Sequence, residues 1–177
     1  MSDATRWVGL RRWLPARDPL AFFSPDDDDR FVWDRARDGR GFAARGALHA
    51  LELDGEQRFE AADADARALL ARIDVRGELA GVDRDPRLTA GFAFAPNEAA
   101  GSLWRGFPSA RIVLPRFIAA RHDDRIAATW FRSVAPGESL DAAHRALEAE
   151  VANAVEPLGP LGEDEGPDGP PSFRAEA

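Results

Sequence analysis

The chain has 177 residues, a formal net charge of −8 at pH 7 and no cysteine. A chain of this length can form one domain that buries about two thirds of the surface of its unfolded state. Without cysteine it can form no disulfide, no thiolate metal site and no thiol nucleophile. The negative net charge, with no basic stripe among aromatic residues to offset it, argues against nucleic-acid binding.

All 23 basic residues are arginine. A lysine general base, a Schiff base and a P-loop lysine are therefore excluded, and with them phosphate binding of the Walker type. The chain has no run of 18 apolar residues and no apolar signal segment near its N-terminus. We therefore expect a cytoplasmic protein with no membrane partner.

Residues 1–17 are expected to form an N-terminal segment ahead of the folded domain. Residues 19–23 and 30–33 are short aromatic runs separated by a polar turn with four aspartates, a pattern that predicts two strands. Residues 42–53 alternate with period two and predict a third strand, in which Gly46 marks a bulge or a close approach of the backbone.

The next segment predicts a helix over residues 56–72. Asp54 is a candidate N-cap, and Gln57 three residues later completes a capping-box signature. Residues 76–86 are polar and rich in turn formers, and residues 88–94 alternate as a fourth strand. The helix presents one apolar stripe, formed by Phe59, Ala62, Ala66, Leu69 and Ile73.

Residues 112–120 and 126–131 are apolar and separated by a short polar loop, so they predict an antiparallel pair. Ser139 is a candidate cap for a second helix over residues 139–155, which Pro157 ends. Residues 157–177 are rich in proline, glycine and acid, and predict a flexible tail. The whole pattern predicts an α+β domain over residues 18–156, with a mainly antiparallel sheet and two flanking helices.

Two acidic stretches are candidate metal sites. Residues 26–29 are four aspartates, but they lack the spacing of a calcium loop, so we favour a solvated turn. His122, Asp123 and Asp124 are consecutive, and consecutive residues of a tight turn rarely converge on one ion without ligands from elsewhere. We therefore favour a structural loop there as well.

Other polar motifs also favour structural roles. His49 is expected on the face of the third strand opposite Phe42 and Leu48, and His144 lies on the apolar stripe of the second helix. No G-x-S-x-G elbow is present to activate a serine. The serines weighed lie in expected turns, caps or the tail: Ser24, Ser102, Ser109, Ser133, Ser139 and Ser172.

The Gly39-Arg40-Gly41 sequence opens a strand rather than a helix, so it predicts a turn and not a dinucleotide-binding loop. A set of aromatic residues could line a ligand pocket, although aromatic residues beside glycines in strands are usually core. We favour core for this set, which is Trp33, Phe92, Phe94, Trp104 and Phe107.

Residues 87–116 read RLTAGFAFAPNEAAGSLWRGFPSARIVLPR. They resemble the N-terminal half of isochorismate synthases, members of the chorismate-utilising enzymes, in which a Gly-Phe-Ala-Phe strand leads through Trp-x-Gly-Phe-Pro into a strand ending Leu-Pro-Arg. Residues 19–33 resemble the opening hairpin of that family, and residues 39–59 resemble its Gly-rich strand and the start of its helix. The resemblance covers residues 18–155, most of the chain.

Two details qualify the resemblance. The chain has no Leu-Leu-Glu-Ser motif of the kind that builds the tryptophan site of anthranilate synthases, which favours the isochorismate branch. Ala90 stands where similar sequences often carry a second glycine before the phenylalanine. One extra methyl group is tolerable in a regular strand, so this difference weakens the match only slightly.

The resemblance implies the fold of the N-terminal part of the chorismate-binding enzyme (aminodeoxychorismate synthase-like) α/β sandwich. Isochorismate synthases convert chorismate to isochorismate for menaquinone, siderophore or salicylate pathways, with Mg²⁺, a lysine that activates water and a glutamate that acts as general acid. The resemblance places these groups in the C-terminal half. We therefore expect no catalytic, cofactor-binding or metal-binding residue in this chain, and Mg²⁺ and chorismate only in the complete enzyme.

The leading hypothesis is a non-catalytic N-terminal half, truncated or split from a catalytic half that lies on the same or a separate chain. The alternative is a free-standing small-ligand-binding or regulatory module on the same scaffold, and a complete small enzyme is the least favoured reading. A lone N-terminal half should expose sheet edges and an apolar face, whereas a free-standing module should have protected them.

Overall fold

A computed structural model describes residues 5–15, 18–23, 27, 29–78, 86–94, 108–122 and 124–155. The strands are β1 (Trp7–Pro15), β2 (Phe31–Arg35), β3 (Arg40–Leu53), β4 (Ile73–Gly77), β5 (Thr89–Phe92), β6 (Ala110–His122) and β7 (Arg125–Ser133). The helices are α1 (Arg58–Leu70) and α2 (Leu140–Val155), with the 3₁₀ helices η1 (Pro19–Phe22) and η2 (Ala36–Asp38). The predicted tail at residues 157–177 lies outside these residues.

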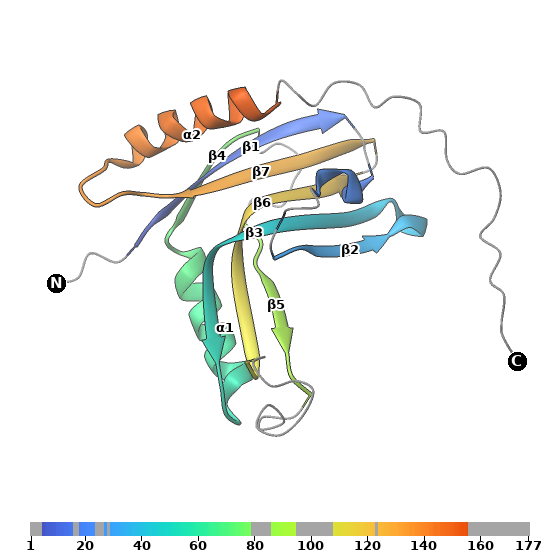
Figure 1. The fold of residues 1–177 in the computed structure, drawn as a ribbon, viewed down its shortest axis with the longest axis vertical. Helices are drawn as coiled ribbons and strands as arrows, with labels where there is room; N and C mark the ends of the chain where they lie inside the picture. The colour runs from blue at the N-terminus through green and yellow to red at the C-terminus, as the bar shows by residue number, and fades with distance from the viewer. Residues whose placement is uncertain are drawn as a thin grey trace, which may run out of the picture.

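The seven strands form one mixed sheet in the order β2-β3-β6-β7-β1-β4, and β5 pairs with β6. Among the described strands, β1 and β4 run parallel and every other neighbouring pair is antiparallel. β3 follows β6 along its whole length, while β7 pairs with one end of β6 and β5 with the other. Figure 1 shows the result, with β1 and β7 across the top, and β3, β6 and β5 side by side below them in that order. The α+β prediction is confirmed.

Helix α2 covers one face of the sheet at β1 and β7, as Figure 1 shows. Its start is fixed by Ser139, whose Oγ accepts a hydrogen bond from the backbone N–H of Ala142 at 3.2 Å. Its predicted apolar stripe is buried against alternate residues of β1. The cluster contains Val8, Leu10, Ala143, Leu147 and Val151. The predicted cap and stripe of this helix are both confirmed.

The opposite face of the sheet carries a second apolar cluster, to which side chains of α1 and β4 contribute. Alternation along β1 places Trp7 on this face, because its neighbour Val8 faces α2. Leu69 from α1 and Ile73 from β4 pack onto the same cluster. The buried members are Trp7, Ala44, Leu69, Leu114, Ile118 and Phe131. The sheet is therefore buried on both faces where the helices lie.

The N-terminal part of the chain differs from the prediction. β1 lies within the sheet, so the sheet begins before residue 18, where the domain was expected to start. Residues 19–22 form η1 instead of a strand, because Asp18 Oδ1 accepts the N–H of Leu20 at 2.8 Å and proline begins the turn. β2 pairs with β3, so the predicted opening hairpin is wrong.

The capping-box prediction for α1 is also wrong. Asp54 Oδ1 accepts the backbone N–H of Ser109 at 3.1 Å and so joins the end of β3 to the start of β6. Gln57 occupies the N-cap position and makes no side-chain cap hydrogen bond. Immediately after α1, β4 pairs with β1, although the sequence predicted a polar turn from residue 76.

The predicted bulge in β3 is confirmed and has a further consequence. Gly46 has a φ of +66°, and the register against β6 shifts between Ala47 and His49. Because one extra residue reverses the alternation of side chains, His49 turns toward the core. Its ring lies 5.1 Å from that of Trp7. The expectation that His49 faces away from Phe42 is therefore wrong.

Candidate functional site

A pocket of about 580 Å³ lies beside β5, between the first residues of β6 and the start of β2. This volume is in the range of about 300–1,000 Å³ that is usual for small-ligand sites. Its walls are mostly small or apolar. The apolar and glycine residues that line it are Phe31, Ala44, Gly46, Ala90, Gly91, Phe92, Ala93, Phe94, Pro108, Val113 and Pro115.

Small residues on β5 keep the pocket open. A Cβ atom added at Gly91 would meet no atom within 4 Å. Phe92 is 43% exposed and stacks on Phe59 of α1 at 4.9 Å, and Phe94 is fully exposed. The interpretation of these aromatic residues as core is therefore wrong for Phe92 and Phe94. It is also wrong for Trp33, which is exposed on β2, while Trp104 and Phe107 lie outside the described residues.

An ion pair forms the polar wall of the pocket. Arg111 binds Asp29 through both oxygens, with Nη1–Oδ1 at 2.6 Å and Nη2–Oδ2 at 3.4 Å. Glu52 Oε1 lies 3.8 Å from Arg111 Nε. Asp29 has a φ of 49°, in the left-handed region that residues other than glycine seldom occupy. Such strain is found preferentially at ligand sites, so the pair marks this wall as a candidate for function.

The aspartate run is therefore only partly a solvated turn. Asp29 holds Arg111, and Asp27 Oδ2 lies 3.4 Å from Nη1 of Arg45. Asp26 and Asp28 lie outside the described residues. The pairing of Asp29 with Arg111 spans 82 residues, which is why sequence reasoning named one partner and missed the other.

Arg30 adds a cation to the rim of the pocket. It lines the cavity, is exposed and forms no ion pair with another described residue. Its guanidinium can therefore accept an anionic partner at little cost in desolvation. The pocket as a whole suits a group with an apolar body and a negatively charged end.

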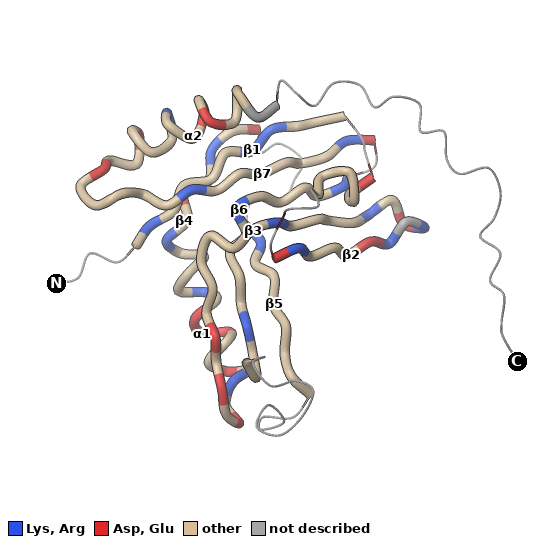
Figure 2. The backbone as a smooth tube through the Cα atoms, viewed as in Figure 1, with Lys and Arg blue, Asp and Glu red and all other residues tan. Residues whose placement is uncertain are grey.

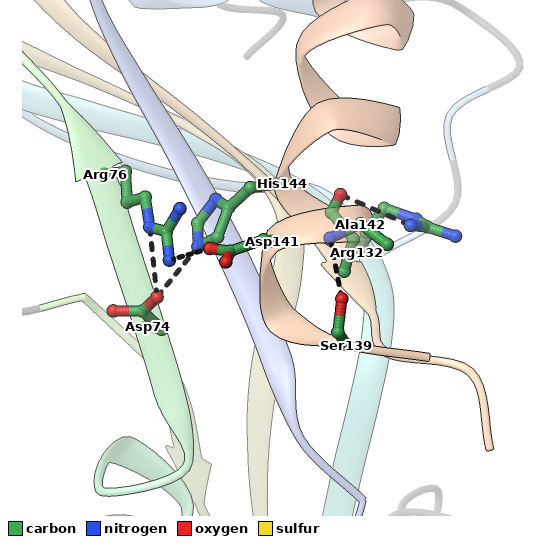
Figure 3. Close-up of polar contacts among 8 residues, drawn as sticks. Asp74, Arg76, Arg132, Ser139, Asp141, Ala142 and His144 are labelled. Carbon is green, nitrogen blue, oxygen red and sulfur yellow. Dashed lines mark hydrogen bonds and ion pairs between the residues drawn. The ribbon is translucent and has the colours of Figure 1, made fainter. Parts of the chain in front are cut away.

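A second polar cluster lies at the other end of the sheet and joins α2 to β4 (Figure 3). His144 is buried, and its Nε2 lies 2.9 Å from Asp74 Oδ2. Arg76 Nη2 donates to Asp141 Oδ1 at 2.8 Å, and its Nε lies 3.4 Å from Asp74 Oδ2. This bond to Arg76 holds the pKa of Asp141 below its ordinary value. His144 therefore lies on the buried side of α2, as the sequence predicted.

The described residues do not fit a metal ion, since they hold no group of three His, Asp or Glu side chains that could bind one. Asp124 Oδ1 lies 3.9 Å from Arg125 Nε, while Asp123 and the side chain of His122 are outside the described part of the chain. Gly39, at a φ of 63°, forms the turn predicted before β3.

The distribution of charge follows the elements. Acidic residues are concentrated along α1 and the turn before it, whereas most arginines are spread over the strands (Figure 2). Many of these arginines are bound to carboxylates, as Arg121 is to Asp34 at 2.8 Å. Neither described helix is long and apolar enough to cross a membrane.

A comparison with known protein families gives a match that spans the described fold. The model of the family described as chorismate binding enzyme matches residues 2–163, which include every strand, both α-helices and every residue that lines the pocket. No curated protein and no solved structure matches the chain. Because the match covers most of the 177 residues, the chain belongs to the chorismate-binding enzyme family.

Proposed function

We propose that the chain is the non-catalytic N-terminal part of an isochorismate synthase, which converts chorismate to isochorismate for menaquinone or siderophore biosynthesis. It acts together with a catalytic half, on the same or a separate polypeptide, and is expected in the cytoplasm. Family membership supports a role in the use of chorismate. The motifs of residues 87–116 support the isochorismate branch.

The open pocket beside β5 is the observation that carries this proposal. A complete domain buries surfaces of this kind, yet Phe92 and Phe94 remain exposed next to an apolar cavity. Exposed apolar patches that adjoin a sheet edge are typical of surfaces that bind another polypeptide. The catalytic half would cover β5 and the pocket, and would gain a rigid support for its own sheet.

The chemical step belongs to the partner in this proposal. The chain contains no lysine to activate water, and its described side chains do not fit a magnesium site. We therefore assign Mg²⁺, chorismate binding and general acid catalysis to the catalytic half. The residues of this chain contribute the docking surface, with Arg30 available to bind a carboxylate of the partner at the rim.

The test is a chorismate turnover assay in Mg²⁺ buffer. The purified chain, the separately produced catalytic half of an isochorismate synthase, and a mixture of the two are compared. We expect that only the mixture forms isochorismate, or that it forms isochorismate at least about tenfold faster than the catalytic half alone. The reason is that docking orders the catalytic half. Turnover by this chain alone would contradict the proposal.

One pair of variants links the assay to the pocket. A Cβ atom at Gly91 would meet no atom within 4 Å, so Gly91→Leu adds a larger side chain to the pocket wall from an open position. Ala152→Leu adds a comparable side chain at an exposed position of α2. We expect Gly91→Leu to abolish the stimulation and Ala152→Leu to preserve it. Equal stimulation by both variants would place the docking surface elsewhere.

A second candidate function rests on the same pocket. Its volume and its apolar wall also suit a small anionic ligand, as does Arg30, which forms no ion pair with another described residue; such a ligand would make the chain a ligand-binding module. Calorimetry of the isolated chain with chorismate and with benzoate tests this directly. Binding that Gly91→Leu abolishes and Arg30→Gln weakens, with no stimulation of a catalytic half, would favour the module.

A further inference from the structure

Arg111 has a fixed place at the wall of the pocket beside β5. On β6 it is in register with Gly91 of β5 on one side and with Glu52 of β3 on the other (Figure 1). Residues directly opposite each other in an antiparallel pair project to the same face of the sheet. A Cβ atom at Gly91 would meet no atom within 4 Å, so the space beside Arg111 on this face is open. Two strands therefore hold a cation at the border of the cavity.

The guanidinium of Arg111 has donors to spare. Its hydrogen bonds to Asp29 are one short contact at 2.6 Å and one long contact at 3.4 Å. Its Nε is buried and has no hydrogen-bond partner, since Oε1 of Glu52 at 3.8 Å is too distant to accept one. Arginine carries more N–H donors than these contacts use. Arg111 can therefore bind a carboxylate that is better placed than that of Asp29.

Asp29 holds Arg111 from a less favourable position. It precedes β2 and takes no part in the strand pairing that fixes Arg111. Its φ of 49° lies in the left-handed region, which residues other than glycine seldom occupy. The side chains of Arg111 and Asp29 are 39% and 29% exposed, so water and solutes reach the pair. An ion pair that is open to solvent contributes little to stability and can exchange its partner.

The rest of the lining suits a ligand with an aromatic body and one carboxylate. The charged residues that the structure places in the lining are Arg30, Arg111 and Asp29, so the pocket is net positive in a chain with a net charge of −8. Aromatic rings attract one another in stacked and edge-to-face arrangements. Three phenylalanines with exposed rings line the same cavity: Phe31, Phe92 and Phe94.

We propose that this pocket is an anion site which the chain occupies with its own Asp29, and that an aromatic carboxylate binds by replacing Asp29 on Arg111. The carboxylate of the ligand accepts the hydrogen bonds of the Arg111 guanidinium, its ring lies over Gly91, and Asp29 turns to solvent. The inference rests on the second candidate function above, in which the pocket takes a small anionic ligand. It adds which cation receives the anion and which group competes with it.

Calorimetry of the chain with benzoate and with its uncharged amide, benzamide, tests the exchange. We expect benzamide to bind at least about tenfold more weakly than benzoate, because hydrogen bonds between charged groups are the stronger ones. Asp29→Asn removes the competing charge, and asparagine tolerates a positive φ. We expect it to tighten benzoate binding by about three- to tenfold, since the site is no longer occupied. Asp29→Gly, which suits a positive φ as well, should have a similar effect.

Two further variants serve as controls. Asp27→Asn removes the same charge from an aspartate that binds Arg45 and is not among the described residues that line the pocket. It should change the affinity for benzoate by less than about twofold, because salt screens charges at a distance. Arg111→Gln should weaken binding by at least about tenfold. In that background Asp29→Asn should no longer tighten binding, because the two residues act on the same site.

The possible results separate this inference from the functions proposed above. If benzoate binds with the same affinity before and after Asp29→Asn and Asp29→Gly, the exchange is wrong, although the pocket still binds an anion. If neither the unmodified chain nor any variant binds benzoate, both the exchange and the ligand-binding function are wrong. Neither result bears on the stimulation of a catalytic half, which the chorismate turnover assay measures separately.

Discussion

The two ends of the sheet differ in how far the described chain covers them. At the β4 end, α2 lies beside the strand, and a polar network of Asp74, Arg76, Asp141 and His144 holds the two together. At the β2 and β5 side, the exposed Phe31, Phe92 and Phe94 line an open pocket. At the first end, the described chain itself supplies the helix that covers the sheet. The second has the composition of a surface that another polypeptide covers.

The difference separates a well-packed platform on the α2 side of the sheet from the proposed docking surface on the β5 side. The platform uses buried apolar side chains on both faces together with paired charges. The binding side has small residues at the pocket wall and little packing to lose. Substitutions should therefore cost stability on the α2 side and binding on the β5 side, and each prediction below tests this contrast.

The largest expected effect is on the packing of α2. Leu147 is 2% exposed and packs against Val8 and Leu10 in one cluster. Leu147→Ala should lower the free energy of unfolding by about 2–5 kcal/mol, because it removes buried methyl groups and leaves a cavity. Urea denaturation measures the loss. Leu20→Ala, at an exposed leucine, should change the free energy by less than about 0.5 kcal/mol.

Two strand glycines test the contrast directly. A Cβ atom at Gly9 on β1 would lie 3.0 Å from Phe131 Cδ1 and 3.1 Å from Val75 Cγ2, whereas one at Gly91 on β5 would meet nothing within 4 Å. Gly9→Ala should destabilise the fold by about 1–3 kcal/mol through overpacking. Gly91→Ala should be neutral or stabilise it by about 0.4–1 kcal/mol. Equal shifts in the urea midpoint would contradict the contrast.

Breaking the polar network should lower the free energy of unfolding by an amount similar to that expected for Gly9→Ala. Asp74→Ala leaves Nε2 of the buried His144 without a partner, beside Nδ1, which already has none. We expect a loss of about 1–3 kcal/mol in the free energy of unfolding, the cost of a buried unpaired polar group. Asp63→Ala, which removes an exposed i,i+4 pair with Arg67, should cost less than about 0.5 kcal/mol.

The smallest expected effect is the pH dependence of the α2 end. Two hydrogen bonds hold the pKa of Glu138 below its ordinary value of 4.5. The one donated by the backbone N–H of Ala135 has the larger effect, and the one donated by Arg132 has the smaller effect. Because the pKa is lowered in the folded state, the stabilisation is complete above pH 4.5 and is lost as the pH falls through the lowered pKa. Glu138→Gln should reduce the fall in Tm between about pH 5 and about pH 3. An unchanged fall would show that this carboxylate does not contribute.

Sequence patterns correctly predicted the elements that are determined by residues close together along the chain. The β6–β7 pair and α2 were predicted because a short polar loop and a serine cap determine them within a few residues. β1 was missed because Arg11 and Arg12 interrupt its apolar pattern. Only the fold reveals that Arg11 is buried and donates through Nε to Thr129 Oγ1 at 3.0 Å.

Long-range partners also limited the prediction of the candidate site. The sequence predicted Asp54 as a helix cap, but its carboxylate accepts a hydrogen bond from the backbone N–H of Ser109 instead. The sequence did not predict Arg111 as a site residue, because its partner Asp29 lies 82 positions away along the chain. The alternation of residues 88–94 predicts that one face is apolar, but it cannot predict whether anything covers that face, and Phe92 and Phe94 are exposed.

The position of β1 has a consequence for how the chain folds. β1 is the first strand to be synthesised, yet its partners are β7, which ends at Ser133, and β4. The pairing of Arg11 with Thr129 spans 118 residues, so the contact order is high and folding is slow compared with a helical protein of this size. During translation, of its two neighbouring strands only β4 is available to β1 until β7 leaves the ribosome. The interval before that moment is when the chain most needs protection from aggregation.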